Sequence, residues 1–154
     1  MANNHTAGTA ARTFAPSELC QRMLAKTSKG TCGPCILYLE DGTIFYGRAC
    51  GAEGTATGEV CFNTSLEGYF EVMTDPSYAG QIVTMTYPQI GNYGIDETDV
   101  QSAFPGDAKR PASAPAMRGM IVRDMCATPS NWRSAVSVPE YLRAHGIVAI
   151  EGVD

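Results

Sequence analysis

Short apolar runs separated by turn residues dominate the chain after residue 34. The first two runs, Cys35–Glu40 and Thr43–Ala49, flank the dipeptide Asp41-Gly42. Asp-Gly between apolar runs is a strong hairpin signal, because a type I′ turn needs positive φ at both central residues. We therefore predict a β-hairpin with a type I′ turn over residues 35–49.

The same pattern of short β-prone runs continues through the rest of the chain. It predicts strands at 59–63, 68–73, 81–86, 117–123 and 147–150, although the run at 68–73 is also compatible with a helix. The proline- and alanine-rich stretch 101–116 interrupts these runs, and we predict a surface loop there.

One helix is predicted after residue 137. Ser137 and Glu140 have the spacing of a capping box, in which each side chain bonds the other residue's backbone amide. Gly146 suits the position just after the helix, where positive φ is common. Since residues 147–150 then form a strand, the helix connects two strands of one sheet.

The chain length of 154 residues favours a single domain. The elements predict a β-rich α/β domain at 35–154, preceded by a tail at 1–34. Because the chain stops directly after a strand, at Asp154, we expect the domain to be part of a longer protein.

The net charge of −5 is unevenly distributed. Residues 1–30 hold four basic residues and one acidic residue, whereas residues 31–154 hold seven and fifteen. An acidic body argues against nucleic acid as the partner. No run of 18 apolar residues is present, so no membrane partner is expected. With six cysteines and no secretory signal, we expect a cytoplasmic protein with reduced thiols; an organelle transit peptide at the N-terminus is the alternative.

Cys32-Gly-Pro-Cys35 is the first candidate for chemistry. Such a pair performs thiol–disulfide exchange when the first cysteine opens a helix, where its thiol pKa falls. Here an apolar run with a hairpin signal follows the pair, which favours an incidental pair over a redox site. Neither His5 nor His145 has a partner at metal-ligand spacing, so no zinc site and no Ser/His/Asp triad are predicted.

Two polar segments remain as candidate sites. Thr74-Asp-Pro-Ser-Tyr78 predicts a tight turn, because Asp75 suits its first position and Pro76 fixes φ at the second. The turn either exposes Ser77 to water without further role or offers its hydroxyl to a small polar ligand. Asn63-Thr-Ser-Leu-Glu-Gly68 places small polar side chains between two predicted elements, where they form a loop or line a polar passage.

Taken in series, the motifs of residues 35–154 resemble those of carbamoyl phosphate synthetase small subunits. The resemblance is carried by Leu39-Glu-Asp-Gly-Thr43, Gly58-Glu-Val-Cys-Phe-Asn-Thr-Ser65, Gly68-Tyr69, Thr74-Asp-Pro-Ser-Tyr78, Gln81-Ile-Val-Thr-Met-Thr-Tyr-Pro88, Ile90-Gly-Asn-Tyr-Gly94, Val122-Arg-Asp124, Ser130-Asn-Trp-Arg133, Gly146-Ile-Val-Ala-Ile150 and Gly152-Val-Asp154. Each motif alone is weak, but their order is specific.

The resemblance implies the N-terminal domain of that subunit, with a three-layer swivelling β/β/α fold. It implies that Ser77 contributes to binding L-glutamine and that Asn63, Thr64 and Ser65 lie near an ammonia path. The implied partners are a class I amidotransferase domain, which is absent from this chain, and the large subunit, which carries ATP and Mg. No cofactor is expected in this domain, and no cysteine here matches the family's catalytic nucleophile, so the fragment alone is expected to be inactive.

The full complex would make carbamoyl phosphate for arginine and pyrimidine synthesis. The competing hypotheses are a stand-alone interaction or scaffold domain and a thiol–disulfide oxidoreductase that uses Cys32 and Cys35.

Overall fold

A β-hairpin begins the part of the chain that the structure describes, residues 33–95, 114–130 and 136–154 of a computed structural model. Strands β1 (Pro34–Tyr38) and β2 (Ile44–Ala49) pair antiparallel, as predicted. The predicted turn type is wrong, because Gly42 alone has positive φ there, at 91°. The Gly42 N–H donates to Leu39 O at 3.0 Å, so the loop is a four-residue turn whose last residue is the glycine with positive φ.

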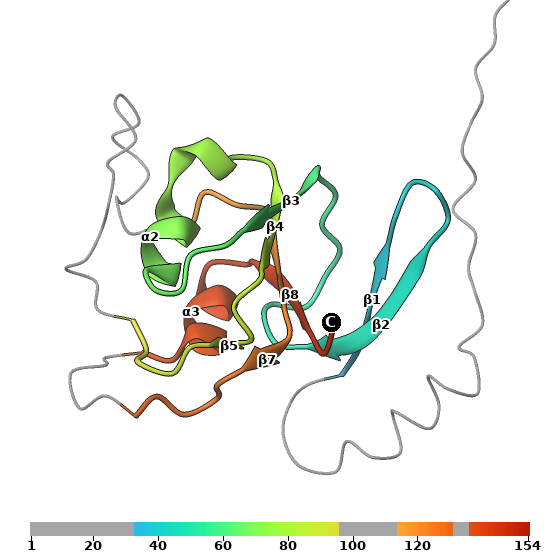
Figure 1. Ribbon diagram of the computed structural model, residues 1–154. Helices are drawn as coiled ribbons and strands as arrows, with labels where there is room; N and C mark the ends of the chain where they lie inside the picture. The colour runs from blue at the N-terminus through green and yellow to red at the C-terminus, as the bar shows by residue number, and fades with distance from the viewer. Residues whose placement is uncertain (1–32, 96–113, 131–135) are drawn as a thin grey trace, which may run out of the picture.

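Four parallel strands form the centre of the molecule (Figure 1). They are β3 (Val60–Asn63), β4 (Ile82–Met85), β6 (Gly119–Val122) and β8 (Val148–Glu151). The hairpin joins them through an antiparallel pairing of β2 with β8, giving the order β1-β2-β8-β6-β4-β3. The carboxyl ends of the four parallel strands together form one boundary of the sheet, here called its carboxyl edge. Ligand sites of such sheets usually lie there.

The preferred strand prediction at residues 68–73 is wrong, because the segment forms helix α2 (Tyr69–Thr74). A strand there would have placed Glu71 on the same face as Tyr69 and Met73. The helix instead buries Tyr69, Phe70, Val72 and Met73, which share one face at helical spacing.

The predicted C-terminal helix is confirmed as α3 (Val138–Ala144). Ser137 and Glu140 form the expected capping box. At the other end Gly146 has φ 69°, and the Ile147 N–H donates to Leu142 O at 2.9 Å, which closes a Schellman motif. The helix connects parallel strands β6 and β8, as its place in the sequence indicated.

Smaller elements complete the described part. They are the 3-10 helix η1 (Pro76–Tyr78) and a parallel pair of short strands, β5 (Gln89–Ile90) and β7 (Asp124–Met125). Most of the predicted loop at 101–116 lies outside the described residues. Its last three residues, 114–116, are buried rather than on the surface, and the Ala116 N–H donates to Met73 O at 2.8 Å.

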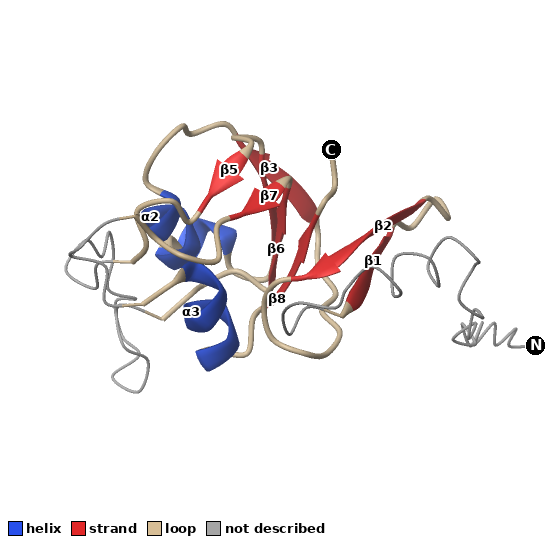
Figure 2. Cartoon of the chain, turned by 90° about the horizontal axis from the view of Figure 1, so that it is seen from below, coloured by secondary structure: helices blue, strands red, loops and turns tan. Residues whose placement is uncertain are grey.

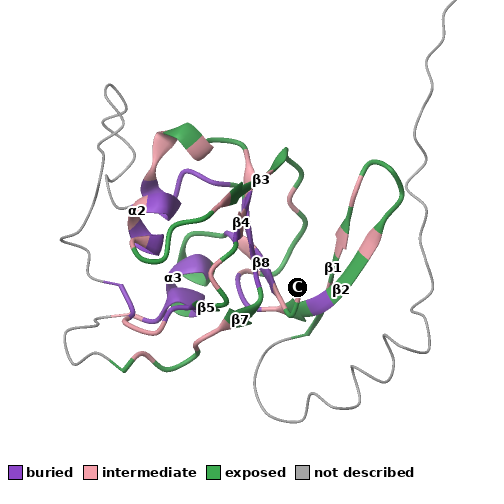
Figure 3. Ribbon diagram, in the orientation of Figure 1, coloured by how far each residue is buried: buried purple, intermediate pink, exposed green. Residues whose placement is uncertain are grey.

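The elements are stacked in layers (Figure 2). Helices α2 and α3 lie on one face of the sheet, and the hairpin extends from its other side. The buried core lies between the helices and the sheet (Figure 3), and includes Met73, Val83, Met120 and Leu142. The prediction of a β-rich α/β fold is therefore confirmed, and the layers are consistent with a β/β/α domain. The predicted tail at 1–34 lies outside the described residues up to residue 32, and Pro34 already belongs to β1.

Candidate functional site

The Asp-Pro-Ser-Tyr turn is well defined. Asp75 ends α2 and caps η1, and its Oδ1 accepts a hydrogen bond from the Ser77 N–H at 2.8 Å. The Tyr78 N–H donates to Asp75 O at 3.1 Å, so the predicted turn is confirmed. Ser77 is exposed, and within the described residues no hydrogen bond occupies its hydroxyl. The backbone of the turn is therefore fixed while the hydroxyl is available to a ligand.

The Asn63–Ser65 segment leaves the carboxyl end of β3. The Asn63 Oδ1 accepts a hydrogen bond from the Ser65 N–H at 2.8 Å, which turns the chain away from the strand. The Asn63 carbonyl accepts from both the N–H and the hydroxyl of Thr86, each at 3.1 Å. Thr64 and Ser65 are exposed, so their hydroxyl groups lie at the surface of this edge.

A side-chain hydrogen bond joins the two segments. The Asn63 Nδ2 donates to the phenol oxygen of Tyr78 at 2.9 Å, across 15 positions of sequence. The Tyr78 side chain thus links the turn that carries Ser77, which precedes β4, to the end of β3, from which the Thr64–Ser65 loop leaves. Both residues of this bond belong to motifs singled out from the sequence, but no spacing rule predicts their contact.

Two large apolar side chains flank the Asn63–Ser65 segment. Phe62 is 73% exposed and Leu66 is 71% exposed. β3 is also an edge strand of the sheet. Single exposed apolar residues are common, but two so exposed beside a polar loop are typical of a surface that another protein covers.

Tyr93 holds the start of α2, directly after the Asn63–Gly68 loop, and this role was not identified from the sequence. Its phenol oxygen accepts hydrogen bonds from the N–H groups of Gly68 at 2.8 Å and Tyr69 at 3.4 Å, so it caps α2 in place of an N-cap side chain. The Tyr69 and Tyr93 rings stack at 4.2 Å. Burial raises the pKa of both phenols, so they stay neutral and act as hydrogen-bonding groups.

The described residues give little support to redox or metal chemistry. Cys35 lies in β1, not at the start of a helix, and burial raises the pKa of its thiol, whereas a reactive thiol needs a lowered pKa. Cys32 lies outside the described residues. In the same described ranges, no three His, Cys, Asp or Glu side chains are grouped as metal ligands would be. His145 packs against Tyr141 at the end of α3, with ring centroids 4.3 Å apart.

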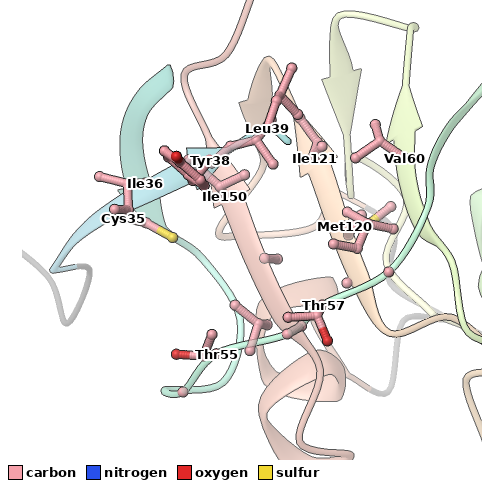
Figure 4. A pocket seen from close by; sticks show the side chains of 18 of the residues that line it. Cys35, Ile36, Tyr38, Leu39, Thr55, Thr57, Val60, Met120, Ile121 and Ile150 are labelled. Carbon is pink, nitrogen blue, oxygen red and sulfur yellow. The ribbon is translucent and has the colours of Figure 1, made fainter. Parts of the chain in front are cut away.

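An apolar groove lies apart from these loops (Figure 4). It has a volume of about 840 Å³ and lies between the hairpin and the sheet face that the helices leave open. Ile36 and Tyr38 of β1 line it together with Val60, Ile121 and Ile150. Cys35 lines this groove, whereas Ser77 and the Asn63–Ser65 segment do not. Among the helices described, none is long and apolar enough to cross a membrane.

Comparison with known proteins identifies the family. The family model for the carbamoyl-phosphate synthase small chain, CPSase domain, matches residues 37–154. Proteins named carbamoyl phosphate synthase small chain are 53% identical in Solidesulfovibrio magneticus and 52% identical in Thermotoga maritima, each over 119 residues, or 77% of this chain. That of Xanthomonas axonopodis pv. citri is 53% identical over 121 residues, or 79%.

The matched region spans only 28–29% of the length of these relatives. The family model nevertheless covers the hairpin from Leu37 onward, the central sheet, both helices and the two candidate loops. The chain therefore belongs to the carbamoyl-phosphate synthase small chain family and carries its CPSase domain.

Proposed function

We propose that this domain takes part in glutamine-dependent synthesis of carbamoyl phosphate, as the N-terminal domain of a small subunit. The proposal combines family membership with the geometry of the Ser77 turn and of the Asn63–Ser65 segment. In it, Ser77 helps bind L-glutamine, and the segment Asn63–Ser65 borders the path taken by ammonia.

The exposed Ser77 hydroxyl carries this proposal. A surface serine that only closed a turn would need no fixed backbone, yet Asp75 holds the Ser77 N–H at 2.8 Å and Pro76 fixes the preceding φ. A hydroxyl can both donate and accept hydrogen bonds, which suits the zwitterionic and amide groups of glutamine. Because the hydroxyl faces away from the domain's own core, a second protein surface must complete the site.

The chemistry of the Asn63–Ser65 segment suits the passage of ammonia. Amide and hydroxyl groups form hydrogen bonds without protonating ammonia, whereas a carboxylic acid could convert it to ammonium. Thr64 and Ser65 are small and exposed beside the Ser77 turn, so a covering surface would enclose them together.

Two partners follow from the proposal. A class I amidotransferase domain would supply the nucleophile that hydrolyses glutamine, and a large subunit would use ATP and Mg to make carbamoyl phosphate for arginine and pyrimidine synthesis. Phe62 and Leu66 offer apolar area to such a covering surface. On its own the domain is expected to hydrolyse no glutamine, and we place the complex in the cytoplasm.

Kinetics of the full-length small chain, assembled with its large subunit, test the role of Ser77. Ser77→Ala should raise the KM for glutamine about 10- to 150-fold, since hydrogen bonds to charged groups contribute about 1.5–3 kcal/mol. The glutamine-dependent rate should fall relative to the ammonia-dependent rate. Thr55→Ala, at an exposed hydroxyl of the β2–β3 loop, is the matched control. Equal KM values for both variants would refute the proposed role of Ser77.

A further inference from the structure

Asn63 makes hydrogen bonds through its carbonyl oxygen and through both ends of its side-chain amide. Its carbonyl accepts two hydrogen bonds from Thr86, its Oδ1 accepts one from the Ser65 N–H, and its Nδ2 donates one to the Tyr78 phenol. A side chain that only lined a passage would leave its amide facing the passage. The amide of Asn63 is instead engaged within the domain.

The direction of each bond is fixed by chemistry. The Ser65 N–H can only donate, so the amide oxygen must face Ser65 and the amide nitrogen must face Tyr78. The phenol oxygen of Tyr78 therefore acts as the acceptor. The Tyr78 ring packs against the buried core cluster, which limits how far the phenol can move.

Tyr78 directly follows Ser77, and both belong to η1. Asp75 fixes the start of this short helix through the Ser77 N–H, and the Asn63–Tyr78 bond fixes its end. Without the second bond, ring packing and the backbone bonds of the turn would still hold η1 in place, but the position of the Ser77 hydroxyl would be less closely fixed. Asn63 itself is fixed, because β3 pairs with β4 over its whole length.

We propose that Asn63 and Tyr78 are positioning residues for glutamine binding: their hydrogen bond ties the Ser77 turn to the end of β3 and so holds the Ser77 hydroxyl where glutamine needs it. This inference rests on the proposed role of Ser77 in binding glutamine. It assigns Asn63 an effect on glutamine affinity, which a residue that only borders an ammonia path would not have.

The variants follow from the bond directions. Tyr78→Phe removes the acceptor and keeps the ring, so the packing of η1 is retained. Asn63→Ala removes both side-chain bonds. Asn63→Asp keeps both, because a carboxylate can accept from the Ser65 N–H and from the Tyr78 hydroxyl. Tyr46→Phe, at an exposed position of β2 that does not line the groove, is the matched control for loss of a phenol.

The experiment measures KM and kcat for glutamine with the full-length small chain assembled with its large subunit. We expect Tyr78→Phe and Asn63→Ala to raise KM about 3- to 10-fold, the range set by loss of one hydrogen bond, with kcat changed less than about 2-fold. Asn63→Asp should retain KM within about 2-fold of the unchanged protein. Tyr46→Phe should have no effect on KM.

A double variant separates positioning from general structural loss. If Tyr78 acts through the Ser77 hydroxyl, adding Tyr78→Phe to Ser77→Ala should raise KM no further, because the hydroxyl that it positions is gone. Multiplicative effects would overturn the inference, as would an unchanged KM for Tyr78→Phe when Ser77→Ala raises it. An unchanged KM for Ser77→Ala would instead refute the proposed function, and this inference with it. If the Tyr78→Phe variant does not assemble with the large subunit, the Asn63 variants test the same inference. A raised KM for Asn63→Ala with a retained KM for Asn63→Asp supports it, and equal KM values overturn it.

Discussion

The two faces of the six-stranded sheet have different coverings. On one face, α2 and α3 pack over Met120 and Val122 and bury Met73 and Leu142 completely. On the other, the hairpin extends over Ile121 and Ile150, which are also buried but belong to no part of the main core cluster. There the described residues leave an open groove, with Ile36 54% exposed.

The difference distinguishes a sheet face that the domain covers with its own helices from surfaces that it leaves exposed. The helix-covered face is closed, with its helix ends satisfied by a capping box, a Schellman motif and the Tyr93 phenol. The hairpin-covered face and the edge beside Phe62 expose large apolar side chains. Stability should therefore depend mainly on the first face, and recognition on the second face and the adjoining carboxyl edge.

The largest expected effect is on the closed face. Leu142→Ala should lower the free energy of unfolding by about 2–5 kcal/mol, because it leaves a cavity at a fully buried position of α3. Phe62→Ala, at an exposed position of β3, should change it by less than about 0.5 kcal/mol. Urea unfolding of the 154-residue chain gives both values. Equal losses would mean that the edge belongs to the core, contrary to the comparison.

A smaller loss of stability is expected for a substitution where the hairpin meets the sheet. A Cβ at Gly47 would collide with the carbonyl oxygen of Glu151 and lie 2.7 Å from Ile150 Cγ1. Gly47→Ala should therefore lower the free energy of unfolding by about 1–3 kcal/mol, since backbone atoms cannot give way easily. Gly33→Ala, where no atom lies within 4 Å of the new Cβ, is the control. Similar urea midpoints for the two variants would show that the hairpin is not tightly joined to β8.

The smallest effect concerns the acid dependence of the closed face. Hydrogen bonds from the hydroxyl and N–H of Ser137 lower the pKa of Glu140 in the folded protein. A lowered folded pKa stabilises the fold above the unfolded pKa of about 4.3, and this contribution disappears as pH falls toward the folded value.

Glu140→Gln should therefore lose less stability than the unchanged chain between about pH 6 and about pH 3. Urea unfolding over this range measures it, with Glu53→Gln in the exposed β2–β3 loop as the control. An acid dependence that Glu140→Gln leaves intact would show that the capping box contributes nothing to the closed face.

Local chemistry explains why some elements were predictable. The Asp41-Gly42 dipeptide specified a hairpin, and Ser137, Glu140 and Gly146 specified both ends of α3. Where a non-local partner decided the outcome, prediction failed. The segment at 68–73 is rich in β-prone residues, but its helix starts on the phenol of Tyr93, 25 positions away from Gly68.

The candidate site divides in the same way. Asp75 and Pro76 are neighbours of Ser77, so the turn and its exposed hydroxyl could be predicted from adjacent residues. The bond between Asn63 and Tyr78 could not, because Asn63 ends β3 whereas Tyr78 precedes β4, and the two side chains meet only in the folded domain.

The sequence by itself determined the turns, the caps and the order of motifs that marks the family, because each depends on residues a few positions apart. Only the tertiary structure decided that 68–73 is a helix, that one sheet face stays open, and that Asn63 reaches Tyr78. These depend on contacts between distant segments, whose free energy outweighs local preference and leaves no signal in residue spacing.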